Sequence, residues 1–214
     1  MKNDKSDAFL SDFLNITDRD TLEANMVFIS LFISLYENFC DIFTERVKFF
    51  YCNGFNSVDG EMVLILSDNY ATKITNRKID GKKNILKSTL LWFVEHNAIT
   101  QEEYATFMKI RDKRNQYVHE MATLFLKGIP EEDVKLLSEL ITLYSKLDKW
   151  WINEIEIPTS GEYLPGTYNE DEVVSVQLLM FSIMIDVLYN GKSEELKKTV
   201  KQFFNQESLQ NRET

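Results

Sequence analysis

The chain has 214 residues, of which 44% are hydrophobic, whereas only 7 are glycine and 3 are proline. This composition favours long helices joined by few turns over many tight hairpins, so it predicts an all-α protein. The formal net charge of -10 argues against a protein that holds nucleic acid by its overall charge, because neutralising phosphates requires lysine and arginine.

The length allows one sizeable hydrophobic core, and no stretch rich in proline, glycine or serine divides the chain. We therefore expect residues 1–214 to form a single helical domain. Residues 1–7 are polar and mixed in charge, and no apolar segment follows them, which indicates neither a signal peptide nor a transit peptide. The expected location is the cytoplasm.

Two apolar runs, Met26 to Phe39 and Val173 to Tyr189, have the composition of membrane spans. Glu37 interrupts the first run, and Gln177 and Asp186 interrupt the second. Both runs are also shorter than the roughly 20 clean apolar residues that a span requires. We expect two buried helices and no contact with a membrane.

The first predicted helix runs from Thr21 to about Phe50, because apolar residues recur there at steps of three and four. Thr17, Asp18 or Asp20 is available as its N-cap. Cys52-Asn53-Gly54 provides a stop signal.

Residues 53–80 are harder to interpret, since they contain turn signals at Asp59-Gly60 and, at their end, Asp80-Gly81. Between these turns, the apolar run Glu61 to Leu66 fits a short helix or a strand equally well by periodicity. A second core helix is expected from Lys83 to about Asn97.

Thr100 and Glu103 form a capping box at the start of the next helix, because each side chain can accept a hydrogen bond from the backbone of the other. This helix should reach Gly128, a typical residue just beyond a helix C-terminus. The remaining expected elements are a helix from Pro130 to Pro158, a loop to about Asn169, an apolar helix from Glu170 to Tyr189, a short helix over residues 193–205 and a frayed tail over 206–214.

The sequence offers no convincing metal or cofactor site. Cys40 and Cys52 lack partners at ligand spacing and are interpreted as reduced thiols, and His96 has no second histidine or cysteine nearby. The glycines do not form a phosphate-binding loop or a dinucleotide fingerprint. We expect neither a metal nor a nucleotide cofactor.

Basic residues gather in two segments despite the acidic total. Six of them lie between Lys73 and Lys87 against one acid, Asp80, and a second group consists of Lys109, Arg111, Lys113 and Arg114. A local positive face is one interpretation, and ordinary solvated charges are the other.

The second basic group leads into Arg114-Asn115-Gln116-Tyr117-Val118-His119. At about 100° per residue, Asn115 and His119 share a helical face with Arg111, and Arg114 lies at its edge. Histidine exchanges protons near neutral pH, and arginine offers a fixed charge and forked donors to phosphate oxygens. An arginine and a histidine can therefore cleave RNA without a metal, although such a pair also occurs by chance.

This stretch resembles the signature of the HEPN family (higher eukaryotes and prokaryotes nucleotide-binding), an arginine followed by a polar residue and, a few residues later, a histidine on a late core helix. The approach from Ile99 to Asn115 and the segment Leu35 to Phe39 also look like the family. The resemblance covers about residues 20–157, and residues from about 158 to 205 form a helical extension. Met121 stands where many toxin members have a tyrosine.

The resemblance implies an all-α HEPN-like helical bundle with additional C-terminal helices, which forms a homodimer in which two arginine–histidine pairs line one cleft. It implies a metal-independent endoribonuclease of a toxin–antitoxin or phage-defence type, with RNA as the substrate and an antitoxin protein as a further partner. Arg114 and His119 would be catalytic, and Asn115, Arg111 and Glu37 would orient the site or bind substrate. The alternative is a non-catalytic HEPN module that binds a nucleotide, RNA or a protein partner.

Overall fold

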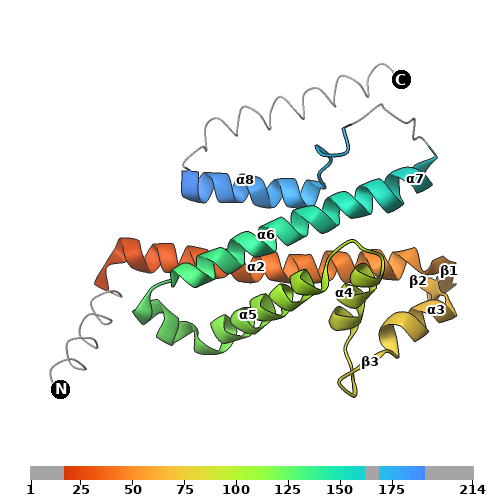
Figure 1. The fold of residues 1–214 in the computed structure, drawn as a ribbon, viewed down its shortest axis with the longest axis horizontal. Helices are drawn as coiled ribbons and strands as arrows, with labels where there is room; N and C mark the ends of the chain where they lie inside the picture. The colour runs from red at the N-terminus through yellow and green to blue at the C-terminus, as the bar shows by residue number, and fades with distance from the viewer. Residues whose placement is uncertain (1–16, 162–168, 191–214) are drawn as a thin grey trace. The chain divides into compact units, whose positions relative to one another are not determined.

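The computed structural model describes residues 17–161 and 169–190, without the side chains of residues 121–127 and 189–190. The chain falls into two compact units, Met1–Leu147 and Asp148–Thr214. The described part is mainly helical, as predicted, and also contains two small antiparallel hairpins (Figure 1). The expected helix over 193–205 and the tail over 206–214 lie outside the described residues.

Helix α2, Arg19–Phe50, confirms the long first helix. Asp18 is the N-cap, and its side chain accepts a hydrogen bond from the backbone N–H of Thr21 at 3.3 Å. In the described part of the chain, α2 alone is long and apolar enough to cross a membrane by length and composition, a test that core helices of soluble proteins also pass. Its apolar stripe is buried in the first unit.

Aromatic side chains of α2 form the centre of the first unit, where α4 (Ile85–Glu95), α5 (Gln101–Lys127) and α6 (Glu131–Trp151) contribute the partners. Phe39 is fully buried; its ring stacks on Phe107 at 4.7 Å between centroids and meets Tyr144 edge-on at 5.6 Å. Phe43 meets Phe93 edge-on at 5.7 Å. These contacts fix α5 against α2, and the Arg114 stretch lies on α5.

Two hairpins follow α2. Strands β1 (Cys52–Val58) and β2 (Glu61–Leu66) pair antiparallel, so the run 61–66 is a strand and not a helix. A short helix α3 (Asp68–Tyr70) and a π-helical turn (Ala71–Thr75) then lead to β3 (Lys78–Ile79) and β4 (Lys82–Lys83). All of these elements belong to the first unit.

The capping box at the start of α5 is confirmed. Thr100 Oγ1 accepts from the N–H of Glu103 at 3.1 Å, and Glu103 Oε2 accepts from the N–H of Thr100 at 2.7 Å. The same carboxylate pairs with Lys146 Nζ of α6 at 2.7 Å. Near the other end, Glu120 leaves the helical conformation, with φ -119° and ψ 18°, so α5 is kinked immediately after His119.

Two boundaries in the second unit differ from the prediction. Pro158 was expected to stop a helix, but it lies in the first turn of α7 (Ile157–Ser160), which follows a π-helical turn over Ile152–Glu156. The last helix was expected to open at Glu170, but residues 170–172 form turns and α8 is Val176–Asn190. Ser175 caps α8, because its Oγ accepts from Leu178 N–H at 3.3 Å.

Candidate functional site

Arg114 lies at the contact between α5 and α2 and is fixed from three sides. Its Nη2 forms an ion pair with Glu37 Oε1, and its Nη1 donates to Asn115 Oδ1 at 3.1 Å. Its Cζ lies 5.6 Å from the centre of the Tyr36 ring. The arrangement brings together Arg114, Asn115 and Glu37, three of the predicted site residues.

The guanidinium retains an unused donor. Arg114 Nε is buried and has no hydrogen-bond partner in the part of the chain that the structure describes, while the whole side chain is 28% exposed. Nε itself is shielded from solvent, so a ligand would meet the exposed part of the guanidinium, whose Nη atoms carry N–H groups beyond those used with Asn115 and Glu37. A partly exposed arginine with a spare N–H is therefore suited to contact a phosphate oxygen.

Two neighbours of Arg114 on α2 are held in their neutral forms. Burial raises the pKa of the Cys40 thiol to about 12, and the nearby Tyr36 hydroxyl and Arg114 offset this only in part. Burial likewise raises the pKa of Tyr36 far above its usual range. A neutral thiol and a neutral phenol shape this site, and neither supplies a nucleophile or a base at neutral pH.

We predict that native Cys40 resists alkylation. In the Cys52→Ser variant, iodoacetamide should label Cys40 at least roughly a hundredfold more slowly in the folded than in the urea-unfolded protein, because the thiolate is the reactive form. Intact-protein mass spectrometry measures the rates. The Cys40→Ser variant, which retains Cys52, is the control for reagent activity, and equal Cys40 labelling in both states would contradict the prediction.

His119 does not meet Arg114 in the single chain. It is exposed on α5, about 7.5 Å further along the helix axis at 1.5 Å per residue. Within the described ranges, its ring shows no hydrogen bond or ion pair, and the Arg114 guanidinium turns toward Glu37 of α2 instead of the imidazole. The histidine is thus free to contact a ligand or a second molecule.

Arg111 is also separate from this group. Its Nη2 pairs with Asp112 Oδ1 at 2.8 Å on the surface of α5. The expectation that Arg111 orients the site has no contact to support it, although the residue lies one turn before Arg114 and Asn115 on the same helix.

A buried anchor that the sequence did not reveal lies beside the motif. Asp133, at the start of α6, is 1% exposed; its Oδ2 accepts from the Tyr117 hydroxyl at 2.6 Å and its Oδ1 pairs with Lys113 Nζ at 2.9 Å. Lys113 and Tyr117 flank Arg114 and Asn115 on α5. The anchor therefore holds the motif-bearing turns of α5 against α6.

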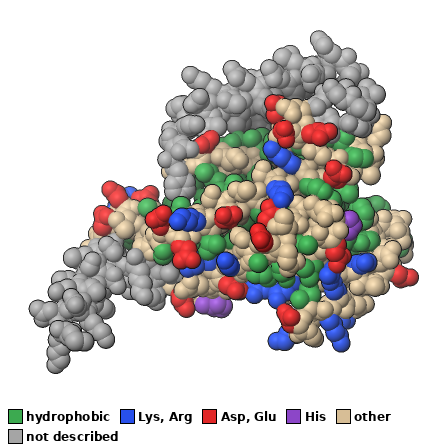
Figure 2. Space-filling model, viewed as in Figure 1, with side chains coloured by type: hydrophobic (Ala, Val, Ile, Leu, Met, Phe, Trp, Pro, Cys, Tyr) green, Lys and Arg blue, Asp and Glu red, His purple; other side chains and the backbone are tan. Residues whose placement is uncertain are grey.

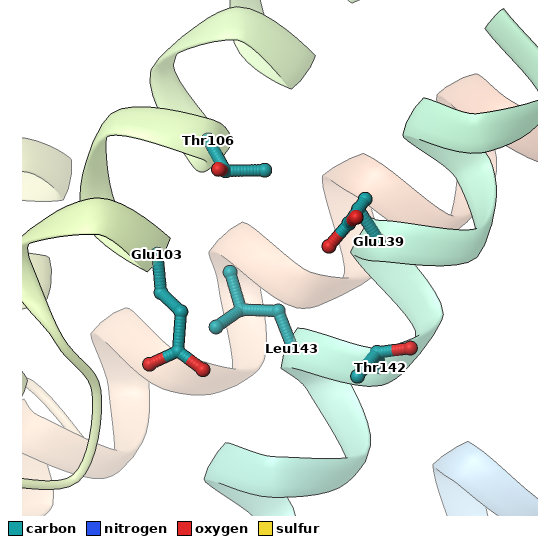
Figure 3. Close-up of a pocket in the computed structure, with 5 residues that line it drawn as sticks. All are labelled: Glu103, Thr106, Glu139, Thr142 and Leu143. Carbon is teal, nitrogen blue, oxygen red and sulfur yellow. The ribbon is translucent and has the colours of Figure 1, made fainter. Parts of the chain in front are cut away.

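The remaining candidates carry no site. His96 ends α4, its Nδ1 lies 2.7 Å from the Trp92 carbonyl oxygen, and its ring packs on Trp92. No group of three or more histidine, cysteine, aspartate or glutamate side chains suited to a metal occurs among the residues described. A small pocket of about 30 Å³ lies between α5 and α6, away from Arg114 (Figure 3); its lining residues are Glu103, Thr106, Glu139, Thr142 and Leu143.

Comparison with known proteins adds no relative: no family model, curated protein or solved structure matches the chain. The geometry of the site and the chemistry of its residues therefore carry the functional argument.

Proposed function

We propose that the protein is a metal-independent endoribonuclease of the HEPN type, which acts in the cytoplasm in a toxin–antitoxin or phage-defence system. The observation that carries the proposal is the placement of Arg114 and His119 on α5. The arginine is fixed and keeps a spare donor, and the histidine is exposed five residues later, before the kink at Glu120. The mainly helical fold agrees with the family that the motif resembles.

In the proposed reaction, the ribose 2′-hydroxyl attacks the adjacent phosphorus, and the bond from phosphorus to the 5′-oxygen breaks. His119 accepts the proton of the 2′-hydroxyl, and the 5′-oxygen leaves with a proton from an imidazolium. Arg114 stabilises the negative charge that builds on the non-bridging oxygens. The products are a 2′,3′-cyclic phosphate and a 5′-hydroxyl, and the step requires no metal.

A homodimer would supply the second histidine that the reaction requires. With two copies facing each other, His119 of one subunit would accept the proton while His119 of the other donates one, and both Arg114 side chains would line the same cleft. In this proposal an antitoxin protein covers the cleft in the resting cell.

The test is an RNA cleavage assay in the presence of a chelator with protein purified free of any bound partner. We expect the wild-type protein to cut single-stranded RNA and to leave 2′,3′-cyclic phosphate and 5′-hydroxyl ends, which chemical and enzymatic end analysis identifies. Structured and unstructured RNAs that stay intact under all conditions where the protein is a folded dimer would contradict the proposal.

The ion pair between Glu37 and Arg114 favours a second candidate, a non-catalytic HEPN module. Glu37 neutralises part of the charge that phosphate would meet, and His119 shares no contact with the pair. Such a module would bind a nucleotide, RNA or a protein partner without turnover. This candidate would be supported if the wild type binds such a ligand without cleaving RNA and the His119→Ala variant binds the same ligand.

A further inference from the structure

The β3–β4 hairpin carries three lysines in a defined strand register. We call Lys78, Lys82 and Lys83 the lysine hairpin. Asp80 and Gly81 form its two-residue turn with φ 52° and 76°, the left-handed conformations that a type I′ turn requires. Antiparallel pairing sets Lys78 directly opposite Lys83, so these two side chains leave the same face of the hairpin, whereas Lys82 lies opposite Ile79 on the other face.

The Lys78–Lys83 pair destabilises the hairpin, because like charges directly opposite each other on paired strands repel. A bound anion would reduce this repulsion. Within the described ranges, no carboxylate pairs with any lysine of the hairpin. Lys83 Nζ instead donates a hydrogen bond of 2.6 Å to a neutral acceptor, Asn76 Oδ1. By contrast, Arg77 pairs with Glu95 at 2.8 Å and Lys87 with Asp80 at 3.9 Å.

The Asp80 carboxylate in the turn of the hairpin acts on Tyr104, in the N-terminal half of α5. Tyr104 of α5 has a raised pKa because of burial and the nearby Asp80 carboxylate, whereas Arg111 and Arg77 act in the opposite direction. Charges from the hairpin segment and from α5 are therefore close enough to influence the same side chain. Figure 2 shows lysine and arginine side chains gathered over the same region, below the centre of the view and toward its lower right.

On α5, Arg111 lies between Tyr104 and the motif, and its ion pair is with the neighbouring Asp112. From Tyr104 to Asn115 the axis of α5 advances by about 16 Å at 1.5 Å per residue, a length that an extended strand of several nucleotides covers. Lysine contacts phosphate as a point charge and reads no base, so the surface is suited to a polyanionic backbone of any sequence.

We propose that the lysine hairpin binds the phosphate backbone of single-stranded RNA and directs the strand along α5 to Arg114 and His119. The inference rests on the proposed ribonuclease function and assigns a substrate-binding surface to it. It also explains how a chain with net charge -10 engages RNA: the binding charge is local.

The test measures binding of a fluorescein-labelled single-stranded RNA by fluorescence anisotropy, in a His119→Ala background that leaves the RNA uncut. The hairpin variant carries Lys78→Gln, Lys82→Gln and Lys83→Gln. The control variant carries Arg19→Gln, Lys48→Gln and Lys135→Gln, which removes the same charge from residues whose partners lie on their own helix.

We expect the hairpin variant to bind RNA about a hundredfold more weakly at about 0.1 M salt, and the slope of log affinity against log salt to fall by about 2, since each lost phosphate contact on a single strand removes about 0.7. The control variant should bind nearly as the parent does. A third variant with arginine at the three hairpin positions should retain binding, which separates lost charge from a damaged fold.

Equal loss in the hairpin and control variants, unchanged binding in the hairpin variant, no RNA binding by the parent, or a preference for duplex DNA would each overturn the inference. The cleavage assay of the wild type is read separately. If RNA binding depends on the hairpin lysines but the wild type does not cleave RNA, the RNA-binding surface is supported and the ribonuclease proposal is contradicted. If the wild type cleaves RNA but binding does not depend on these lysines, the ribonuclease proposal is supported and the RNA-binding surface is contradicted.

Discussion

Replacement of His119 by alanine is expected to slow RNA cleavage by a factor of about 10² to 10⁴, the usual contribution of a positioned acid or base. Because the His119 ring is exposed and shares no hydrogen bond or ion pair within the described ranges, its removal should leave the melting temperature nearly unchanged. The rate should be measured at saturating RNA, so that weakened binding does not contribute.

Val118→Ala is the matched control, because Val118 is 44% exposed on the adjacent position of the same helix and offers no proton chemistry. Its rate should stay close to that of the wild type. Arg114→Ala should also lose cleavage, by about 10² to 10³ if the guanidinium stabilises the transition state. Wild-type rates in a folded His119→Ala protein would exclude this histidine from the chemistry and leave the binding module as the better description.

Asp133→Ala is expected to lower the free energy of unfolding by about 3 to 5 kcal/mol, the range for breaking a buried ion pair by removing one partner. The variant leaves the Tyr117 hydroxyl and the Lys113 ammonium without their acceptor at the start of α6. Urea denaturation followed by circular dichroism measures the change. Because the anchor flanks the motif, cleavage by the folded fraction should fall as well.

A double-mutant cycle with Lys113→Met and Asp133→Asn separates the ion pair from the rest of the anchor. If the pair is coupled, the double variant should lose less stability than the two single variants added together. Additive losses, or a loss below about 1 kcal/mol in Asp133→Ala, would show that Asp133 does not hold α5 and α6 together.

Helices with strong local signals could be predicted from the sequence. The period of α2 and the capping box of α5 are properties of neighbouring residues, and both elements are found where they were expected. The run 61–66 could not be assigned, because a short apolar segment fits either period until its partner strand is known. Likewise, Asp80-Gly81 was recognised as a turn, but strands of two residues have no periodicity to detect.

In the candidate site, too, residues that are close in sequence could be predicted, whereas contacts between distant residues could not. Arg114, Asn115 and His119 were found because they are close in sequence, and Glu37 was proposed through the family resemblance alone. Asp133 was not singled out from the sequence, because no residue near it in the chain indicates the buried contact with Tyr117, 16 positions away. The start of α8 was misplaced because the acids at 170–172 resemble a first turn, whereas Ser175 is the cap.

The Glu103 carboxylate takes part both in the start of α5 and in the contact of α5 with α6. It accepts the N-cap hydrogen bond that begins α5 and also the ammonium of Lys146 from α6. Partial burial opposes its charged form, but Lys146 and Thr100 outweigh that effect, so the pKa of Glu103 is lowered. The stabilisation is present above the ordinary pKa of glutamate and is lost as the pH falls through the lowered value. Protonation of Glu103 therefore weakens the first turn of the motif helix and the contact of this helix with α6 at the same time.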